Sequence, residues 1–448
     1  MIGATPYEFM LVVGVLLWAG TALWYVREPF ASIYHPITHY LVFHGVLFAI
    51  RPVLAHVLRY DELYAAMKFQ PSWADKMTVL AAANLGLIVF VSVAARVGGL
   101  PMSRAPSAVQ GEPPRFDAGF WTMIVLCVPP AIWSLYAGLA GTLVGAGSMI
   151  VNMETGATVN TTGNGYYNDV NLMLGPIAVL IAWTARFRWW SLLPLLVFIL
   201  ARAGTGGRWP FVMAVLSCAS LWAWERRLRW PAGRLIVAAI PLFALFTVIG
   251  EDRGRAIRSF FGGEQVASGA SNYFTMRPLE SMDFGNMEFF EYMVHTVPAK
   301  TGTYDYFLIN AQIVTEPIPR VLWSGKPQGA PFERLFIWRY GTSVGATMAI
   351  PGEGWRAAGW IGVVLWTAFF AFVYGRIYNA YVASRQDWVR TALFMLFMPV
   401  ALQCFRDGLL LSVLKTSFFA VVPVLIWWGV NRLVSGSHPA GPPRVVPG

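Results

Sequence analysis

Apolar runs long enough to cross a bilayer recur along most of this 448-residue chain. A helix needs about 20 mostly apolar residues to span the hydrocarbon core of a membrane. Hydrophobic residues make up 56% of the chain and charged residues only 12%, whereas soluble domains carry about a quarter charged residues. The sequence therefore predicts a polytopic membrane protein and argues against a soluble enzyme.

Run length predicts an all-α bundle of about eleven membrane-spanning helices. The expected spans are Phe9–Val26, Ile37–Leu58, Met77–Arg96, Phe120–Leu139, Asn171–Ala185, Trp189–Ala201, Trp209–Trp224, Leu235–Ile249, Ala357–Gly375, Val389–Phe405 and Phe418–Leu433. The fifth and sixth are short and share almost no loop. The expected organisation is an eight-span bundle at 1–249, a long outer loop with short interfacial helices at 250–356, three spans at 357–434 and a disordered tail at 435–448.

The net charge of +10 would suit a nucleic-acid partner in a soluble domain. Here the basic residues cluster at the ends of apolar runs, where the positive-inside bias explains them without nucleic acid. Short basic loops then define the cytoplasmic side: Arg186, Arg188, Arg226, Arg227, Arg229, Arg234, Arg376, Arg385, Arg390 and Arg432. The opposite, outer side receives Tyr60–Asp75, Gly141–Asp169, Gly204–Arg208, Gly250–Arg356 and Arg406-Asp407. The residues of chemical interest thus gather on the outer face.

Arginines dominate that outer face. Arg253, Arg255 and Arg258 follow the eighth expected span closely enough to face one anionic group, such as a phosphate or pyrophosphate. Snorkelling at the membrane interface explains the same three residues equally well. Arg202 and Arg208 bracket a glycine-rich turn, and an arginine as deep as Arg202 is expected to pair with a polar group.

Two further arginines lie in or beside spans. Arg51 precedes Pro52 inside the second span, where proline opens the helix backbone. Arg406 has the carboxylate of Asp407 next to it, so a structural ion pair is the expected arrangement.

His295 belongs to the segment 286–297, whose apolar residues repeat at helical spacing. Met287, Phe290, Met293 and Val297 form this stripe, which predicts a helix lying on the membrane surface. The imidazole could act as a general base towards a sugar hydroxyl, or cap the helix.

The stretch Glu316-Pro-Ile-Pro-Arg-Val-Leu-Trp-Ser-Gly-Lys-Pro327 stands out as a proline-stiffened polar loop. Arg320 and Lys326 are candidates to meet anionic charge. Trp323 could stack on a sugar ring or anchor the loop at the interface.

Metal chemistry has no pattern to support it in the sequence. No Asp-x-Asp pair occurs, and the three cysteines fall in separate apolar runs. A metal-dependent sugar-nucleotide transferase is therefore not expected, and neither is any other cofactor.

Several short motifs resemble the Wzy-type polymerases of O-antigen and exopolysaccharide repeat units. The most specific is Ile318-Pro-Arg-Val-Leu-Trp-Ser-Gly-Lys-Pro327, followed by Pro351-Gly-Glu-Gly-Trp355 and Gly359-Trp-Ile-Gly362. Supporting motifs are Thr205-Gly-Gly-Arg208, Thr162-Gly-Asn-Gly-Tyr-Tyr167 and Phe405-Arg406.

The resemblance implies a metal-independent, multi-pass enzyme of the glycosyltransferase C type in the bacterial inner membrane, acting on the periplasmic face. It would join undecaprenyl-pyrophosphate-linked oligosaccharide repeat units, with a chain-length regulator and a flippase as pathway partners. The implied pyrophosphate-binding residues are Arg202, Arg208, Arg253, Arg255, Arg258, Arg320, Lys326 and Arg356, with Trp323 on the sugar. His295, Glu353 or Asp252 would take the proton of the acceptor hydroxyl. The motif Pro351–Trp355 lacks a histidine, which leaves the base open.

Two alternatives remain at the sequence level. An O-antigen ligase would move the finished glycan from the same lipid carrier to lipid A core. A lipid or oligosaccharide transporter would use the arginines to line a translocation path, although no symmetry between halves of the chain is visible.

Overall fold

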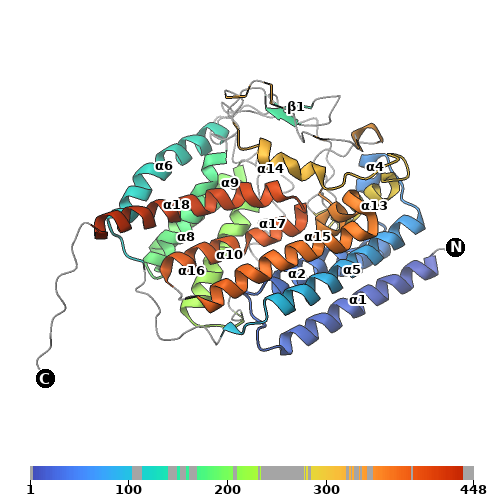
Figure 1. The fold of residues 1–448 in the computed structure, drawn as a ribbon, viewed down its shortest axis with the longest axis horizontal. Helices are drawn as coiled ribbons and strands as arrows, with labels where there is room; N and C mark the ends of the chain where they lie inside the picture. The colour runs from blue at the N-terminus through green and yellow to red at the C-terminus, as the bar shows by residue number, and fades with distance from the viewer. Residues whose placement is uncertain are drawn as a thin grey trace, which may run out of the picture.

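The structure is a computed structural model that describes residues 4–102, 114–139, 149–151, 158–160, 169–204, 209–230, 233, 277, 279–280, 284–318, 322–323, 325–326, 332, 335, 337–340, 347–384 and 387–436. Helices dominate these residues (Figure 1). One antiparallel pair of short strands accompanies them, β1 (Met149–Val151) with β2 (Thr158–Asn160).

Among the described residues, seven helical stretches are long and apolar enough to cross a membrane, which confirms a multi-pass helical membrane protein. They cover Pro6–Arg27, Pro36–Leu58, Trp73–Val97, Ala118–Ala137, Ala349–Ala383, Trp388–Asp407 and Leu410–Val434. In helix labels these belong to α1 (Ala4–Arg27), α2 (Pro36–His44) with α3 (Arg51–Leu58), α5 (Trp73–Val97), α6 (Ala118–Leu139), α15 (Ala349–Ala383), α16 (Trp388–Phe397) with α17 (Val400–Asp407), and α18 (Leu410–Gly436).

The fifth, sixth and seventh expected spans are helical but shorter than the other spans. They correspond to η4 (Val170–Met173) with α8 (Leu174–Thr184), η5 (Trp189–Leu192) with α9 (Leu193–Gly204), and α10 (Trp209–Glu225). The eighth, at 235–249, lies outside the described residues. The described part of the chain thus supports a multi-pass bundle, and the count of eleven stays a prediction.

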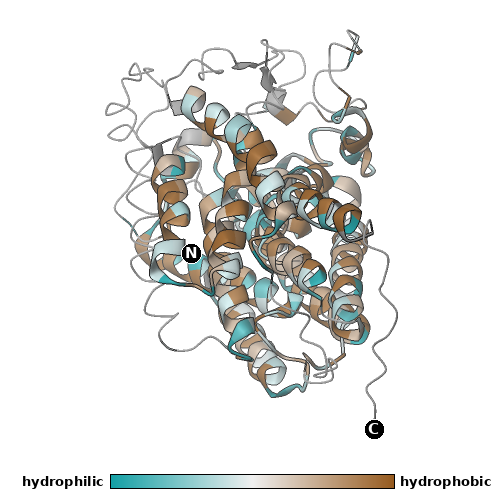
Figure 2. Cartoon of the chain, turned by 90° about the vertical axis from the view of Figure 1, so that its left-hand side faces the viewer, coloured by the Kyte–Doolittle hydropathy of each residue, from teal (hydrophilic) through white to brown (hydrophobic). Residues whose placement is uncertain are grey.

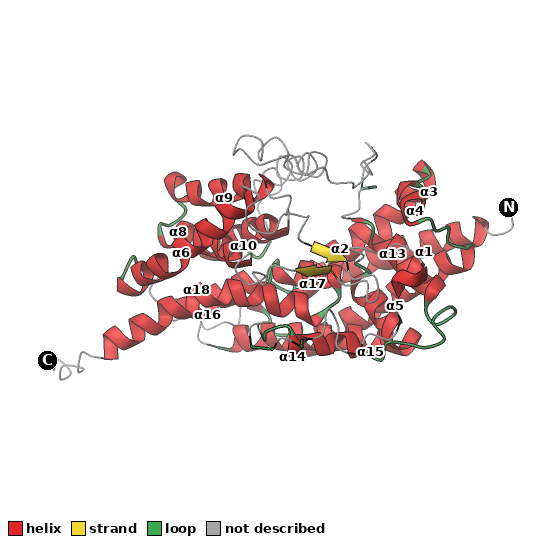
Figure 3. Cartoon of the chain, turned by 90° about the horizontal axis from the view of Figure 1, so that it is seen from above, coloured by secondary structure: helices red, strands yellow, loops and turns green. Residues whose placement is uncertain are grey.

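The helices form two groups joined by the C-terminal ones. In Figure 3, α6, α8, α9 and α10 lie on one side and α1, α3, α5 and α13 (Asn286–Thr296) on the other, with α15 to α18 extending between them. α15 packs along α5, and α18 packs along α6. Hydrophobic residues run along the long helices (Figure 2). Large apolar side chains such as Phe9 and Leu16 are exposed on α1, as expected for a surface that faces lipid.

The second span contains a π-helical segment, η1 (Gly45–Ile50), between α2 and α3. Pro52 follows it at the start of α3. Proline has no backbone N–H, and its ring clashes with the carbonyl four residues earlier in a regular helix. The wider π turn accommodates this defect. The backbone irregularity expected at Arg51-Pro52 is therefore present.

α15 reverses direction at a kink near its beginning. Ala358 and Gly359 have non-helical backbone angles, and Gly359 has φ of 58°, a conformation that glycine adopts without strain. We call Ala349–Ala357 the first arm. Gly354 on this arm meets Gly362 beyond the kink so closely that a Cβ on Gly354 would lie 2.6 Å from the Gly362 carbonyl oxygen. Two of the glycine motifs in the sequence thus serve this close crossing, and the kink coincides with the span start expected at Ala357.

α13 is buried, so the expected helix on the membrane surface is wrong. Met287, Phe290, Met293 and Val297 all lie in the core. The other side of the helix carries Phe289 and Tyr292, which are also buried. Because the helix is apolar nearly all round, it packs inside the fold and presents no separate face to a membrane.

Candidate functional site

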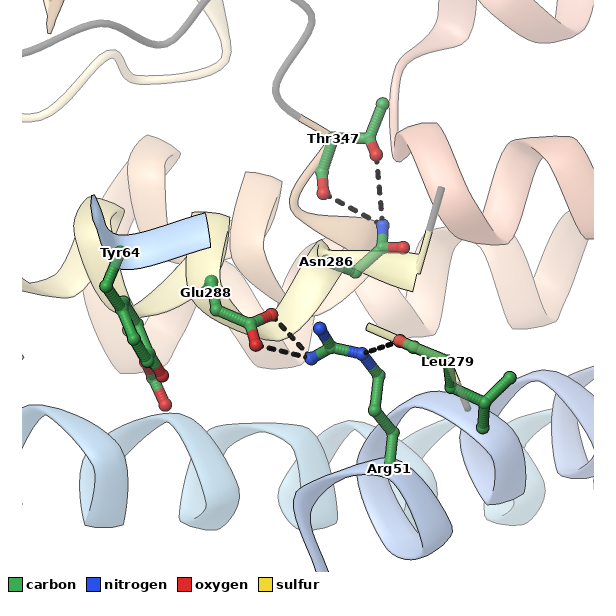
Figure 4. A network of polar contacts seen from close by, with 7 residues as sticks. Arg51, Tyr64, Leu279, Asn286, Glu288 and Thr347 are labelled. Carbon is green, nitrogen blue, oxygen red and sulfur yellow. Dashed lines mark hydrogen bonds and ion pairs between the residues drawn. The ribbon is translucent and has the colours of Figure 1, made fainter. Parts of the chain in front are cut away.

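α13 carries a buried ion pair to the second span (Figure 4). A guanidinium nitrogen of Arg51 lies 2.6 Å and 2.5 Å from the two carboxylate oxygens of Glu288. Its Nε donates to the Leu279 carbonyl at 2.8 Å. Both charged side chains are fully or almost fully buried. The π-helical segment positions Arg51 here, and the pair ties α13 and Leu279 to the N-terminal bundle.

A second carboxyl on α13 lies one helical turn further on. The Tyr64 hydroxyl, from α4 (Glu62–Met67), donates to Glu291 at 2.5 Å. The pKa of Glu291 is raised from 4.5 to about 8; burial is the largest cause, the nearby charge of Glu288 also raises it, and Lys76 lowers it. Burial, with the charges of both glutamates, also raises the pKa of Tyr64 well above 10. Glu291 is therefore mostly protonated at neutral pH, and Glu288 carries the charge that Arg51 balances.

Sequence reasoning identified Arg51 but missed Glu280, Glu288 and Glu291, which are all buried. The signal was present in α13, where two carboxylates interrupt an otherwise apolar segment. A charge in such a segment is normally buried only with a partner. That partner comes from more than 200 positions away in the chain, and no local pattern reveals it.

A second polar cluster lies at the end of α17. Arg406 contacts the Asp407 carboxylate at 3.5 Å, which confirms the expected ion pair. Its guanidinium also lies over the Trp209 ring, with its central carbon 5.0 Å from the ring centroid. Trp209 begins α10 directly after the glycine-rich turn of the sequence.

The first arm of α15 reaches the same place. Gly408 ends α17 in the left-handed conformation, with φ of 72°. A Cβ there would lie 2.7 Å from the Glu353 side chain, so this carboxylate packs directly against the end of α17. The Arg356 guanidinium lies 4.0 Å from Glu353. Glu353 thus pairs with Arg356 on the first arm and packs against the end of α17, two residues beyond Arg406.

A small apolar cavity of about 30 Å³ lies near the end of α17. Pro210, next to Trp209, forms part of its wall, and so does Thr416, which donates to Gln403 at 3.4 Å. Gln403 in turn contacts Asp407 at 3.5 Å. The other lining residues are mainly apolar and come from η4, α8, α10, α16, α17 and α18: Leu172, Pro176, Met213, Ala214, Ser217, Leu396, Val400 and Ala420. Side-chain contacts therefore connect the wall of this cavity to Asp407, next to Arg406.

His295 lies away from Arg406. Asn286, at the start of α13, donates to the Arg406 carbonyl at 2.9 Å. At a rise of about 1.5 Å per residue, His295 is about 13 Å further along the helix. Its Nδ1 lies 3.3 Å from Asp75, and its ring lies 4.9 Å from that of Phe69. Glu353, by contrast, has the Arg356 guanidinium as its neighbour.

The remaining described candidates have polar partners or are partly exposed. Arg202 donates to Asn171 at 2.8 Å, as expected for a deep arginine. Lys326 donates to the Glu316 carbonyl at 2.9 Å and lies 3.4 Å from its carboxylate. Trp323 is partly exposed. Six predicted residues lie outside the described part of the chain: Arg208, Asp252, Arg253, Arg255, Arg258 and Arg320.

The region at the end of α17 contains the Glu353–Arg356 pair, a second guanidinium on Arg406, and a small apolar cavity nearby. Such an arrangement can hold an anionic group on an apolar chain and accept a proton next to it. Within the described ranges, no three His, Cys, Asp or Glu side chains gather in a way that could hold a metal ion. Comparison of the chain with protein-family models, curated proteins and solved structures finds no match.

Proposed function

We propose that this protein polymerises undecaprenyl-pyrophosphate-linked oligosaccharide repeat units into a surface polysaccharide, as a membrane-embedded glycosyltransferase with the glycosyltransferase C type of fold. The reaction would take place at the periplasmic face of the bacterial inner membrane. One observation carries the proposal: the Glu353–Arg356 pair packs against the end of α17, which also carries Arg406 and lies near a small apolar cavity. The motifs that resemble repeat-unit polymerases supply two of these segments.

The apolar lipid and the charged pyrophosphate of a lipid-linked sugar correspond to the apolar and the charged residues of this site. The apolar side chains that line the small cavity between the helices would contact part of an isoprenoid chain. The pyrophosphate carries concentrated negative charge, which guanidinium groups bind through several donors at once. Arg406 is already oriented by its contacts with Trp209 and Asp407.

The transfer requires a base and a stabilised leaving group. The acceptor hydroxyl attacks the anomeric carbon of the growing glycan, and its proton passes to the Glu353 carboxylate. The bond from that carbon to the pyrophosphate oxygen breaks, and the lipid pyrophosphate leaves with the bonding electrons. Arg356 and Arg406 meet the negative charge that develops there. Among the three base candidates, Glu353 is favoured because its carboxylate lies 4.0 Å from the Arg356 guanidinium.

The test uses purified protein in lipid nanodiscs with lipid-linked repeat units as the sole substrate. Nucleotide sugars, added metal and lipid A core are left out. We expect longer glycans to form. Loss of a transition-state contact typically costs about 10²–10³-fold in rate, so Arg406→Ala and Glu353→Gln should lower the rate by at least that much while single repeats remain.

Arg390→Ala is a matched control because Arg390 lies near the opposite end of the same span and is half exposed. It should retain the parental rate. Absence of elongation by the parental protein would reject the polymerase proposal. Transfer only after addition of lipid A core would identify a ligase instead.

A further inference from the structure

Four apolar side chains project from the segment that follows α13, in a part of the chain rich in polar residues. We call the described residues 305–318, 322–323 and 325–326 the rim segment. Val314 is 70% exposed and Leu322 is 79% exposed. Ile318 and Trp323 are exposed to a smaller degree. The rim segment therefore presents several exposed apolar side chains that lie close together in the sequence.

The charged groups of the same segment differ in placement. The Lys326 side chain is only 8% exposed and lies against Glu316, whose side chain is 42% exposed. A surface that faces water normally exposes lysine and covers leucine. Leu322 and Lys326 in the rim segment reverse this pattern.

Hydrogen bonds hold the rim segment at the ends of two spans. The backbone N–H of Leu410, the first residue of α18, donates to Asn310 at 3.2 Å. The N–H of Tyr306 donates to the Ala357 carbonyl at 2.9 Å, at the end of the first arm of α15. Just beyond the kink, Trp360 and Ile361 are exposed. The apolar side chains of the rim segment therefore continue a surface that begins on the spans.

The helix in this segment packs against one of the spans. α14 (Gln312–Thr315) contacts α18, and in Figure 1 it lies above α18. The ends of two spans are where the membrane–water interface is expected. Tryptophan and tyrosine are enriched at that depth, and Trp323 and Tyr306 are both partly exposed here.

We infer that the rim segment lies in the interfacial layer of the bilayer, with Val314, Ile318, Leu322 and Trp323 inserted among the lipids. This assignment chooses the anchoring role for Trp323 over sugar stacking. It also moves the interfacial element of the protein from α13 to α14 and the residues after it. The inference does not depend on the proposed transferase activity.

The test places a fluorescent label at Leu322→Cys in nanodiscs that contain this protein and phospholipid only. The native cysteines Cys127, Cys218 and Cys404 are buried, so the introduced thiol should label selectively in the folded protein. We expect lipids with spin labels near the headgroup to quench most of the fluorescence. Iodide in the aqueous phase should quench it weakly.

Two controls bracket the result. A label at Leu16→Cys, exposed on α1 within a span, should be quenched by lipid. A label at Lys300→Cys, exposed in the turn after α13, should be quenched by iodide and not by lipid. Val314→Cys provides a second rim position in case Leu322→Cys fails to fold.

A rim label that iodide quenches and lipid does not would overturn the inference. In that case the apolar surface is free for another protein or for a sugar. Protection of the label from iodide only after addition of a lipid-linked glycan would assign the surface to substrate and would equally reject membrane insertion.

Discussion

α13 and the rim segment both lie in the stretch between two sets of spans, yet they differ in which side chains they bury. α13 buries Glu288 and Glu291 among aromatic side chains, whereas the rim segment exposes Leu322 and covers Lys326. The difference follows from the partners available to each segment. Arg51 and Tyr64 reach α13 from the N-terminal bundle, and the rim segment is held at the ends of α15 and α18. Burial in this chain is therefore decided by contacts between distant segments and not by local polarity.

Removal of the buried Arg51 side chain should have the largest effect on the stability of α13. Arg51→Ala leaves the Glu288 carboxylate buried without its ion-pair partner, which typically costs about 3–5 kcal/mol. We expect a large fall in the thermal unfolding temperature in detergent or nanodiscs. Arg390→Ala is the control, because Arg390 and Asp387 form an ion pair at 3.7 Å in which both side chains are about half exposed; exposed pairs of this kind contribute about 0–1 kcal/mol. Equal effects from the two variants would show that burial of the Arg51 pair does not govern the stability of α13.

The protonation of Glu291 gives the next largest effect. Its pKa in the folded protein, about 8, lies above the ordinary 4.5, so folding takes up a proton between these values. Its contribution to stability is full below about pH 4.5 and is lost as the pH rises towards 8, by up to about 1.4 kcal/mol per pH unit. Glu291→Gln should flatten the fall in unfolding temperature between pH 5 and pH 8. A slope that the substitution leaves unchanged would assign the pH dependence to other groups.

Packing of the first arm offers a smaller and sharper test. Gly354→Ala places a methyl group against the Gly362 carbonyl, and overpacking of this kind costs about 1–3 kcal/mol. Gly429→Ala in α18 meets no atom within 4 Å and should leave the unfolding temperature equal or slightly higher. If both alanine variants unfold alike, the two arms of α15 do not pack as tightly as described.

The sequence predicted the elements of this fold better than their environments. Run length located the seven long apolar helices, because twenty apolar residues have few alternatives to crossing a membrane. The kink at Ala358 and Gly359 fell at the expected start of a span. By contrast, the apolar stripe on α13 was predicted to face the membrane surface and instead packs in the protein core. Helical spacing shows which residues share a face but not what covers that face.

The site was predictable in part for the same reason. Arg406 and Glu353 were found within their motifs. The contact of Glu353 with the end of α17 depends on the Gly408 turn and on the kink of α15, and neither follows from local composition. The ion pair between Arg51 and Glu288 depends on a tertiary contact. Arginine alone indicated that a partner was needed, and only the fold supplies its identity.

The π-helical turn at Gly45–Ile50 has a consequence for how this chain tolerates insertions and deletions. A regular helix turns about 100° per residue, so the extra residue of a π turn resets the angular phase of everything after it. The side chains of α3 therefore point in directions that differ from those an unbroken continuation of α2 would give. This change of direction lets α2 face the interior of the bundle while Arg51 of α3 faces α13. Deleting a single residue between α2 and α3 would swing Arg51 about a quarter turn away from Glu288 while the span stays long enough to cross the bilayer.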